Sequence, residues 1–177
     1  MDLRNVLLEI HGDLRDARIE HALIGGLALA AHGAARATVD IDWLVEGERA
    51  DDVDRIARGR GYGCLHRSTH AANYAADLPA RGRIDFLFAR QAHGRAMLAR
   101  ASARAILGHP IRVVDASDLI GLKVQASAND PRRRHLDLAD IARLLETGEV
   151  DLARVREYFR IFDREKELDA LLAERGR

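Results

Sequence analysis

Two carboxylates interrupt an apolar stretch, ATVDIDWLV, that otherwise has the composition of a β-strand: Asp40 and Asp42. Because strand side chains alternate between faces, both acids are expected on one face together with Thr38 and Leu44. Their separation along the strand, about 6.6 Å, lets them bind one divalent cation between them or share a pair of cations. The opposite face is apolar and is expected to face the core: Val39, Ile41, Trp43 and Val45.

A third carboxylate, Asp85, has the same setting in the apolar stretch RIDFLFA. If the two strands are neighbours, Asp85 comes within about 5 Å, measured between Cβ atoms, of one of the first two acids. Without a cation such carboxylates repel one another, by about 4 kcal/mol per pair at 4 Å and a dielectric constant near 20, and Mg²⁺ would remove that repulsion. Mg²⁺ with oxygen ligands is what phosphoryl and nucleotidyl transfer need, and two ions can stabilise the attacking and leaving oxygens together.

The alternative interpretation is structural. Acids on an exposed strand face also serve as solvated surface charges, or pair with nearby cations such as Arg36 and Arg83. Two glycines favour a site instead. Gly25 and Gly26 lie between the apolar run HALI and the helix-forming run LALAA, where backbone amides can hold phosphate and a missing side chain lets a nucleotide approach closely. By themselves these glycines would equally suit a tight turn.

Periodicity predicts the elements that must position these residues. The first twenty residues form an amphipathic helix in this prediction, and residues 62–80 contain one or two irregular strands before a turn at 79–82. Strands are expected at 21–24, followed by a tight turn at 25–26, and at 36–47, 83–89 and 109–115. Helices are expected at 27–33, 48–61 and 92–107. Pro110 places the strand 109–115 at a sheet edge or makes this residue a strand start.

No strand pattern follows Ser117, and the remaining residues are predicted to be helical. One helix is expected to start with Asp130 as its N-cap and Pro131 as its first residue, and to end before Gly148. The expected helices are 117–128, 131–147, 151–162 and 165–176. The chain is therefore divided into a domain of residues 1–115 and a C-terminal helical region of residues 116–177 packed on it.

The overall charge does not favour binding to nucleic acid or to an anionic membrane, because 28 Lys and Arg balance 28 Asp and Glu. The first residues lack the long apolar run of a signal peptide or a membrane span. The single cysteine, Cys64, cannot form an internal disulfide. We therefore expect a cytoplasmic protein without a membrane partner.

The stretch LIGGLALAAHGAARATVDIDWLV, followed by RIDFLF, resembles the nucleotidyltransferase superfamily with the DNA polymerase beta-like fold. More narrowly, GGLALAAHG, RATVDID and DLIGLKVQASANDPRRRHLDLADIARLL look like AbiEii-type nucleotidyltransferases of abortive-infection and toxin–antitoxin systems. The resemblance implies an α/β (α+β) fold, with a small mixed sheet flanked by helices and a C-terminal helical annex.

The resemblance also implies roles for residues. It makes Asp40, Asp42 and Asp85 the catalytic and metal-binding residues, with Asp85 as the base for the acceptor hydroxyl. The expected nucleotide-binding residues are Gly25, Gly26, Arg36, Thr38, Lys123, Asp137 and Asp140.

Several of these residues have structural alternatives. Arg36 could instead form a salt bridge to Asp40, and Lys123 could extend its ammonium group from an apolar helix into solvent. The spacing of Arg133, Asp137 and Asp140 also suits an ion-pair ladder on one helix face.

The predicted function is metal-dependent transfer of a nucleoside monophosphate from a nucleoside triphosphate to an acceptor hydroxyl, in a toxin–antitoxin or phage-defence system. Mg²⁺ is the expected cofactor, with two ions per site and Mn²⁺ as an alternative. The acceptor is RNA, a protein or a small molecule, and a toxin or antitoxin is a candidate partner. The competing function is a non-catalytic nucleotide-binding or partner-binding antitoxin module with the same fold.

Overall fold

The computed structural model describes residues 2–147 and 149–175. They form two compact units, which are treated separately below. The first unit contains the chain up to Ala28 together with Arg36–Val114, and the second contains Leu29–Ala35 and the chain from Asp115 onward.

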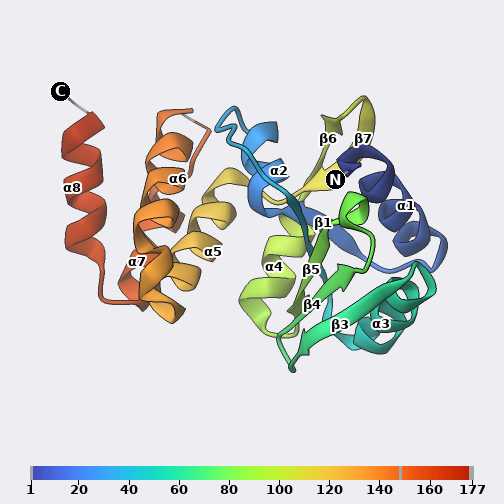
Figure 1. Ribbon diagram of the computed structural model, residues 1–177. Helices are drawn as coiled ribbons and strands as arrows, with labels where there is room; N and C mark the ends of the chain where they lie inside the picture. The colour runs from blue at the N-terminus through green and yellow to red at the C-terminus, as the bar shows by residue number, and fades with distance from the viewer. Residues whose placement is uncertain (1, 148, 176–177) are drawn as a thin grey trace. The chain divides into compact units, whose positions relative to one another are not determined.

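A mixed sheet forms the centre of the first unit (Figure 1). In the described part of the chain it has seven strands, in the order β3-β4-β5-β2-β1-β7-β6. The strand β2 pairs antiparallel with β1 and parallel with β5, so two segments far apart in the sequence become neighbours. The strands are β1 (His21–Ile24), β2 (Asp40–Glu46), β3 (Tyr62–Arg67), β4 (Ala71–Ala76), β5 (Arg83–Ala89), β6 (Ser102–Ile106) and β7 (His109–Val113).

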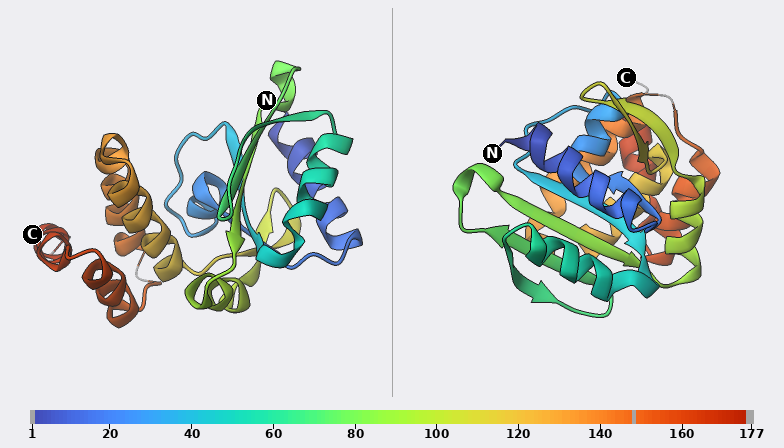
Figure 2. Two further views of the ribbon diagram at one scale, coloured as in Figure 1. Left: turned by 90° about the horizontal axis from the view of Figure 1, so that it is seen from below. Right: turned by 90° about the vertical axis from the view of Figure 1, so that its right-hand side faces the viewer.

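Helices cover both faces of this sheet. α1 (Leu3–Asp16) and α3 (Ala50–Gly59) lie on one face, and α4 (Ala92–Arg100) lies on the other (Figures 1 and 2). Apolar strand residues beneath α1 and α3 form the main core, in which Ile41, Trp43, Ile84 and Phe86 are each at most 1% exposed. Short 3-10 turns occur at Gly47–Arg49, Pro79–Arg81 and Pro131–Arg133. The mixed sheet flanked by helices confirms the predicted fold class.

The predicted helix 92–107 is wrong in its second half. The helix α4 ends at Arg100, and Ser102–Ile106 forms β6, which pairs antiparallel with β7. Leu107 and Gly108, both with positive φ, form the tight turn between these strands. Cross-strand pairing therefore overrides a helical propensity that the alanines of this segment favour. Because β7 lies between β1 and β6, Pro110 is at a strand start and not at a sheet edge.

The strand β2 is shorter than its apolar pattern suggests. It begins at Asp40, so Val39 has no neighbouring strand and is 68% exposed, although it was expected on the core face. Ile41, Trp43 and Val45 do face the core, as predicted. Alternation therefore holds only where the strand is paired.

The second unit is helical, and no strand follows Val113 within the described residues. Asp115 caps the first of its long helices, and Asp130 accepts a hydrogen bond from the amide of Arg132 ahead of the next. The predicted helix end at Gly148 lies outside the described residues. The helices are α2 (Gly25–Ala31), which spans both units, and α5 (Ala116–Asn129), α6 (Arg134–Glu146), α7 (Leu152–Ile161) and α8 (Glu165–Arg175). Within the described ranges, none of the helices has the length and apolar character needed to cross a membrane.

Two histidines, one buried and one partly exposed, are packed against Trp43 in the first unit. His21 is 8% exposed, and its Nδ1 lies 2.7 Å from the carbonyl oxygen of Ile19. Because a carbonyl only accepts, Nδ1 of His21 carries the hydrogen. Nε2 of the neutral ring then accepts from Nδ1 of His11, 2.8 Å away. Both rings contact Trp43, with centroid distances of 6.2 Å for His11 and 5.3 Å for His21.

This pair makes stability depend on pH. Burial, the neighbouring His11 and Arg112 lower the pKa of His21 from 6.5 to about 4. Between these values the unfolded chain binds the proton and the folded chain does not, so stability present above pH 6.5 is lost as pH falls toward 4. Between pH 7.5 and pH 5 the wild type should lose about 2 kcal/mol more unfolding free energy than His21→Phe, measured by urea denaturation. The exposed His135→Gln should retain the wild-type pH dependence, and equal slopes for all three proteins would contradict the assignment.

Candidate active site

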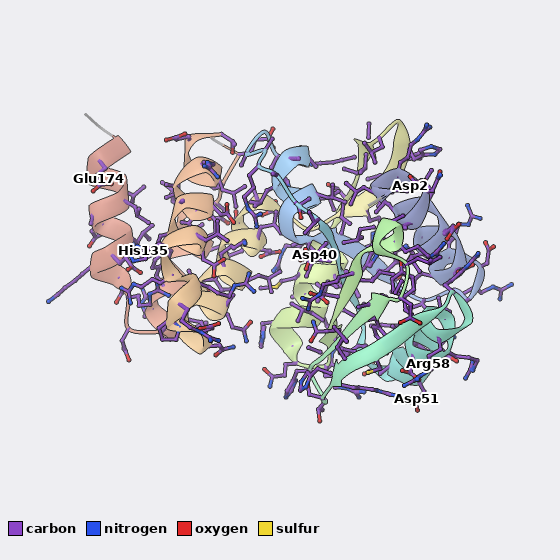
Figure 3. The ribbon with its side chains drawn as sticks, in the orientation of Figure 1. Asp2, Asp40, Asp51, Arg58, His135 and Glu174 are labelled. Carbon is purple, nitrogen blue, oxygen red and sulfur yellow. The ribbon has the colours of Figure 1, made fainter. Side chains whose placement is uncertain are left out.

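The structure brings the predicted carboxylates together on one face of the sheet. Asp42 of β2 and Asp85 of β5 are direct partners in the parallel pairing, on strands about 4.8 Å apart. Asp40, labelled in Figure 3, lies two residues earlier on β2, opposite Arg83. All three carboxylates are partly exposed. The expectation that the two acidic strands are neighbours is confirmed.

Gly25 packs directly against one of these carboxylates. It follows Ile24, which is paired with Asp42 across the β1–β2 ladder, and its φ is +64°. A Cβ atom at Gly25 would lie 1.9 Å from Oδ2 of Asp42, far inside van der Waals contact. Both the backbone conformation and the close approach therefore require glycine here.

Gly26 is constrained by a different neighbour. A Cβ atom there would lie 2.6 Å from Cβ of Thr38, so the helix start packs against the segment that leads into β2. The hydroxyl of Thr38 donates a hydrogen bond to the carbonyl oxygen of Asp40, at 3.2 Å. The glycine pair, Thr38 and the acids thus form one connected cluster. Thr38 precedes the strand, so this contact and not strand alternation places it there.

Arg36 also precedes β2, so strand alternation does not predict the direction of its side chain. Its Nη1 donates to the carbonyl oxygen of Ala37 at 3.0 Å. Its predicted role at the nucleotide stays a prediction.

Gly25→Ala tests the close approach. Alanine must adopt a left-handed conformation and displace the carboxylate of Asp42, so we expect a loss of about 2 to 3 kcal/mol of unfolding free energy. Gly61→Ala is the matched control, because Gly61 has a φ of +80° but nothing within 4 Å of the added Cβ. It should lose only about 1 kcal/mol, the cost of the backbone conformation. Urea denaturation measures both, and equal losses would show that the contact with Asp42 is unimportant.

The acids fit a hard cation held in part by substrate. Oδ1 of Asp40 is buried and has no hydrogen-bond partner among the described residues. Asp42 and Asp85 place two like charges side by side, an arrangement that a cation stabilises. The described residues contain no group of three or more His, Cys, Asp or Glu side chains arranged around a metal position. Mg²⁺ commonly needs only one or two carboxylates, with water and phosphate oxygens as further ligands, so the carboxylates present fit it.

Solved structures share this fold over most of the chain. The antibiotic-resistance factor ANT(2'')-Ia superimposes with a TM-score of 0.69 at 18% identity, covering 99% of both chains. Its complex with adenylyl-2''-tobramycin superimposes with a TM-score of 0.68 at 18% identity, covering 90% of this chain and 97% of that one. The lincosamide antibiotic adenylyltransferase LnuA, lincomycin-bound, superimposes with a TM-score of 0.59 at 14% identity. The match covers 81% of this chain and 96% of LnuA. The chain has a nucleotidyltransferase fold. No family model and no curated protein matches its sequence.

The superfamily resemblance seen in the sequence is thus confirmed for the nucleotidyltransferase fold, and the narrower AbiEii-type resemblance stays a prediction. Sequence reasoning missed one polar residue of this site. Asn73 of β4 is the antiparallel partner of Asp85, so Ile24, Asp42, Asp85 and Asn73 form a row across four strands. The signal was present in AANYAA, where Asn73 alternates with the buried Ala72 and Tyr74.

The remaining predicted residues form a buried ion cluster in the helical unit. Nζ of Lys123 lies 3.1 Å from Oδ1 of Asp137 and 2.8 Å from Oδ2 of Asp140. Both carboxylates are fully buried, and Lys123 is 7% exposed. Arg133 and Arg143 approach the two acids from the partly exposed side, each at 3.6 Å. The predicted ladder of Arg133 and Asp137 is therefore present, and Lys123 turns inward to the acids.

Proposed function

We propose that this chain is a metal-dependent nucleotidyltransferase that transfers a nucleoside monophosphate from a nucleoside triphosphate to an acceptor hydroxyl. The observation that carries the proposal is the side-by-side pair Asp42 and Asp85 with Gly25 packed on it. A purely structural role would not require a glycine at positive φ against a carboxylate, nor leave Oδ1 of Asp40 buried without a hydrogen bond to the described residues.

In this proposal the triphosphate lies beside Gly25 and Gly26, whose missing side chains let Asp42 and Thr38 pack against the backbone. Thr38 packs against Gly26 and fixes the start of the acidic strand. We assign Arg36 to the phosphates because a guanidinium group pairs with phosphate oxygens. Lys123, Asp137 and Asp140 are also proposed to bind nucleotide, with the two acids holding the ammonium group.

Asp40, Asp42 and Asp85 would hold Mg²⁺, or Mn²⁺, in one or two positions. When bound, the ion would supply positive charge that stabilises the developing negative charge of the reaction. Asp85 accepts the proton of the acceptor hydroxyl. The acceptor oxygen then forms a bond to the α-phosphorus in line with the bond that breaks, and pyrophosphate leaves with that electron pair. Asn73, next to Asp85 in the sheet, is placed to orient this carboxylate.

The acceptor is proposed to be RNA, a protein or a small molecule with a hydroxyl group. Two solved neighbours favour the small molecule, because one contains adenylyl-2''-tobramycin and the other is a lincosamide adenylyltransferase with lincomycin. The sequence resemblance to AbiEii-type proteins favours RNA or protein, with a toxin or antitoxin as partner. A toxin–antitoxin or phage-defence role belongs to this second alternative.

The test is transfer of label from α-³²P nucleoside triphosphates by the purified chain with Mg²⁺. Host RNA, host protein, tobramycin and lincomycin serve as separate acceptors, beside Asp42→Asn. Label that depends on Asp42 in one acceptor would establish the reaction and name the acceptor class. Mg²⁺-dependent nucleotide binding without transfer to any acceptor would support the non-catalytic antitoxin module instead. Transfer that persists in Asp42→Asn would contradict the proposed site.

A further inference from the structure

A pocket opens in the first unit, on the sheet face opposite the acids. Strand alternation places His21 and Leu23 on the face of Trp43, whereas Ile24 shares the face of Asp42. The pocket has a volume of about 400 Å³, which is within the range of small-molecule sites. It lies between the end of α1, the start of β1 and the β6–β7 hairpin. Its polar lining residues are His11, Arg15, Arg18, Glu20, His21 and Arg112.

The lining is positively charged. It contains three arginines and one glutamate, an excess of two positive charges with both histidines neutral. Arg112 is held by Glu20 at 3.1 Å and by the carbonyl oxygen of Leu98 at 2.6 Å. Arg15 pairs with Asp16 next to the pocket, and Arg18 forms no ion pair with any residue that the structure describes. Arginines suit a phosphate monoester, which carries about −1.5 to −2 at pH 7.

His11 adds a fixed hydrogen-bond acceptor. The hydrogen bond from His21 to the carbonyl of Ile19 leaves Nε2 of His21 as an acceptor, so Nδ1 of His11 must donate to it. Nε2 of His11 is therefore the unprotonated nitrogen of the neutral ring. Burial, with the positive charge of Arg15 and the neighbouring His109, lowers the pKa of His11 and favours that neutral state. Within the described residues this Nε2 makes no hydrogen bond. A hydroxyl group is the matching donor on a ligand.

We propose that this pocket binds a small phosphate monoester that also carries a hydroxyl group. The phosphate is recognised by Arg15 and Arg18, and the hydroxyl donates to Nε2 of His11. Ile19, Ala103 and Pro110 supply an apolar wall for the carbon skeleton of the ligand. The site is separate from the carboxylate face and does not depend on the proposed transfer reaction.

Amide chemical shifts of the full chain, titrated with ribose 5-phosphate, test the proposal. Saturable shifts are expected at His21, Ala103 and Arg112, and Arg18→Gln should weaken binding about five-fold or more. Arg4→Gln is the matched control, since Arg4 is an exposed arginine on α1 that does not line the pocket, and it should bind as the wild type does. Shifts confined to Gly25 and Asp42, or equal affinity of wild type and Arg18→Gln, would overturn the proposal.

Two further probes separate the phosphate from the hydroxyl. Methyl phosphate has no hydroxyl on its carbon, and ribose has no phosphate. His11→Phe retains a ring beside Trp43. It should weaken the binding of ribose 5-phosphate several-fold and leave the affinity for methyl phosphate unchanged. Because this variant also removes the partner of His21, the Nε2 ¹⁵N shift of His11 in the wild type gives a second measurement. It should move with ribose 5-phosphate and not with methyl phosphate, and identical behaviour of the two ligands would contradict the role of His11.

Discussion

Asp42→Asn is expected to lower nucleotidyl transfer by about three orders of magnitude, or about 4 kcal/mol of transition-state stabilisation. Asparagine keeps the shape of the side chain between Ile24 and Asp85 but removes the charge that would hold Mg²⁺. The apo variant should be at least as stable as the wild type, because the repulsion between adjacent carboxylates is gone. Loss of activity without loss of stability distinguishes a functional acid from a structural one.

Mg²⁺ gives an independent measurement that requires no acceptor. The ion should raise the midpoint of thermal unfolding of the wild type, since it binds the folded carboxylates and not the unfolded chain. Asp42→Asn should lose this increase. Asp77→Asn is the matched control, because Asp77 is an exposed acid in the loop between β4 and β5, and it should retain both activity and the Mg²⁺ effect. An unchanged Mg²⁺ effect in Asp42→Asn would show that the cation binds elsewhere or not at all.

The acidic face of the sheet could be predicted because it depends on a local rule. Alternation within DIDWLV and RIDFLF separates the acids from Ile41, Trp43 and Phe86, and burial in the structure follows that separation. The sequence predicted that Asp85 lies near the other acids only if the two strands are neighbours, because strand order is set by long-range pairing. The structure shows that Asp42 and Asp85 are direct partners.

The missed elements share a physical cause. Ser102–Ile106 is held as a strand by its pairing with β7, which no local pattern contains. Asn73 lies in a stretch surrounded by turn-forming residues, and its place beside Asp85 is set by the pairing of β4 with β5. His11 and His21, ten residues apart, meet only because α1 packs across the start of β1. Each omission thus depends on contacts with another element of the structure, which periodicity within one segment does not show.

Lys123→Met should destabilise the helical unit by about 3 to 5 kcal/mol, the range measured when one partner of a buried ion pair is removed. Methionine has nearly the same length but leaves the carboxylates of Asp137 and Asp140, each 0% exposed, without an ammonium group. Arg133 lies 3.6 Å from Asp137, and Arg143 lies 3.6 Å from Asp140. Because these arginines still compensate the two carboxylates in part, the expected loss of unfolding free energy is near the lower end of this range. Urea denaturation of the full chain measures the change. Arg143→Gln, which removes a half-exposed partner, is the control and should cost about 0.5 kcal/mol.

A triple variant separates the structural role of Lys123 from nucleotide binding. Lys123→Met combined with Asp137→Asn and Asp140→Asn removes all three charges together, so most of the lost unfolding free energy should return. If the ammonium group also contacts phosphate, this stable variant should still bind nucleoside triphosphate at least about ten-fold more weakly than the wild type. Full recovery of both stability and nucleotide affinity would make the cluster purely structural. Failure to recover stability would instead show that the network stabilises the unit through hydrogen bonds that asparagine cannot replace.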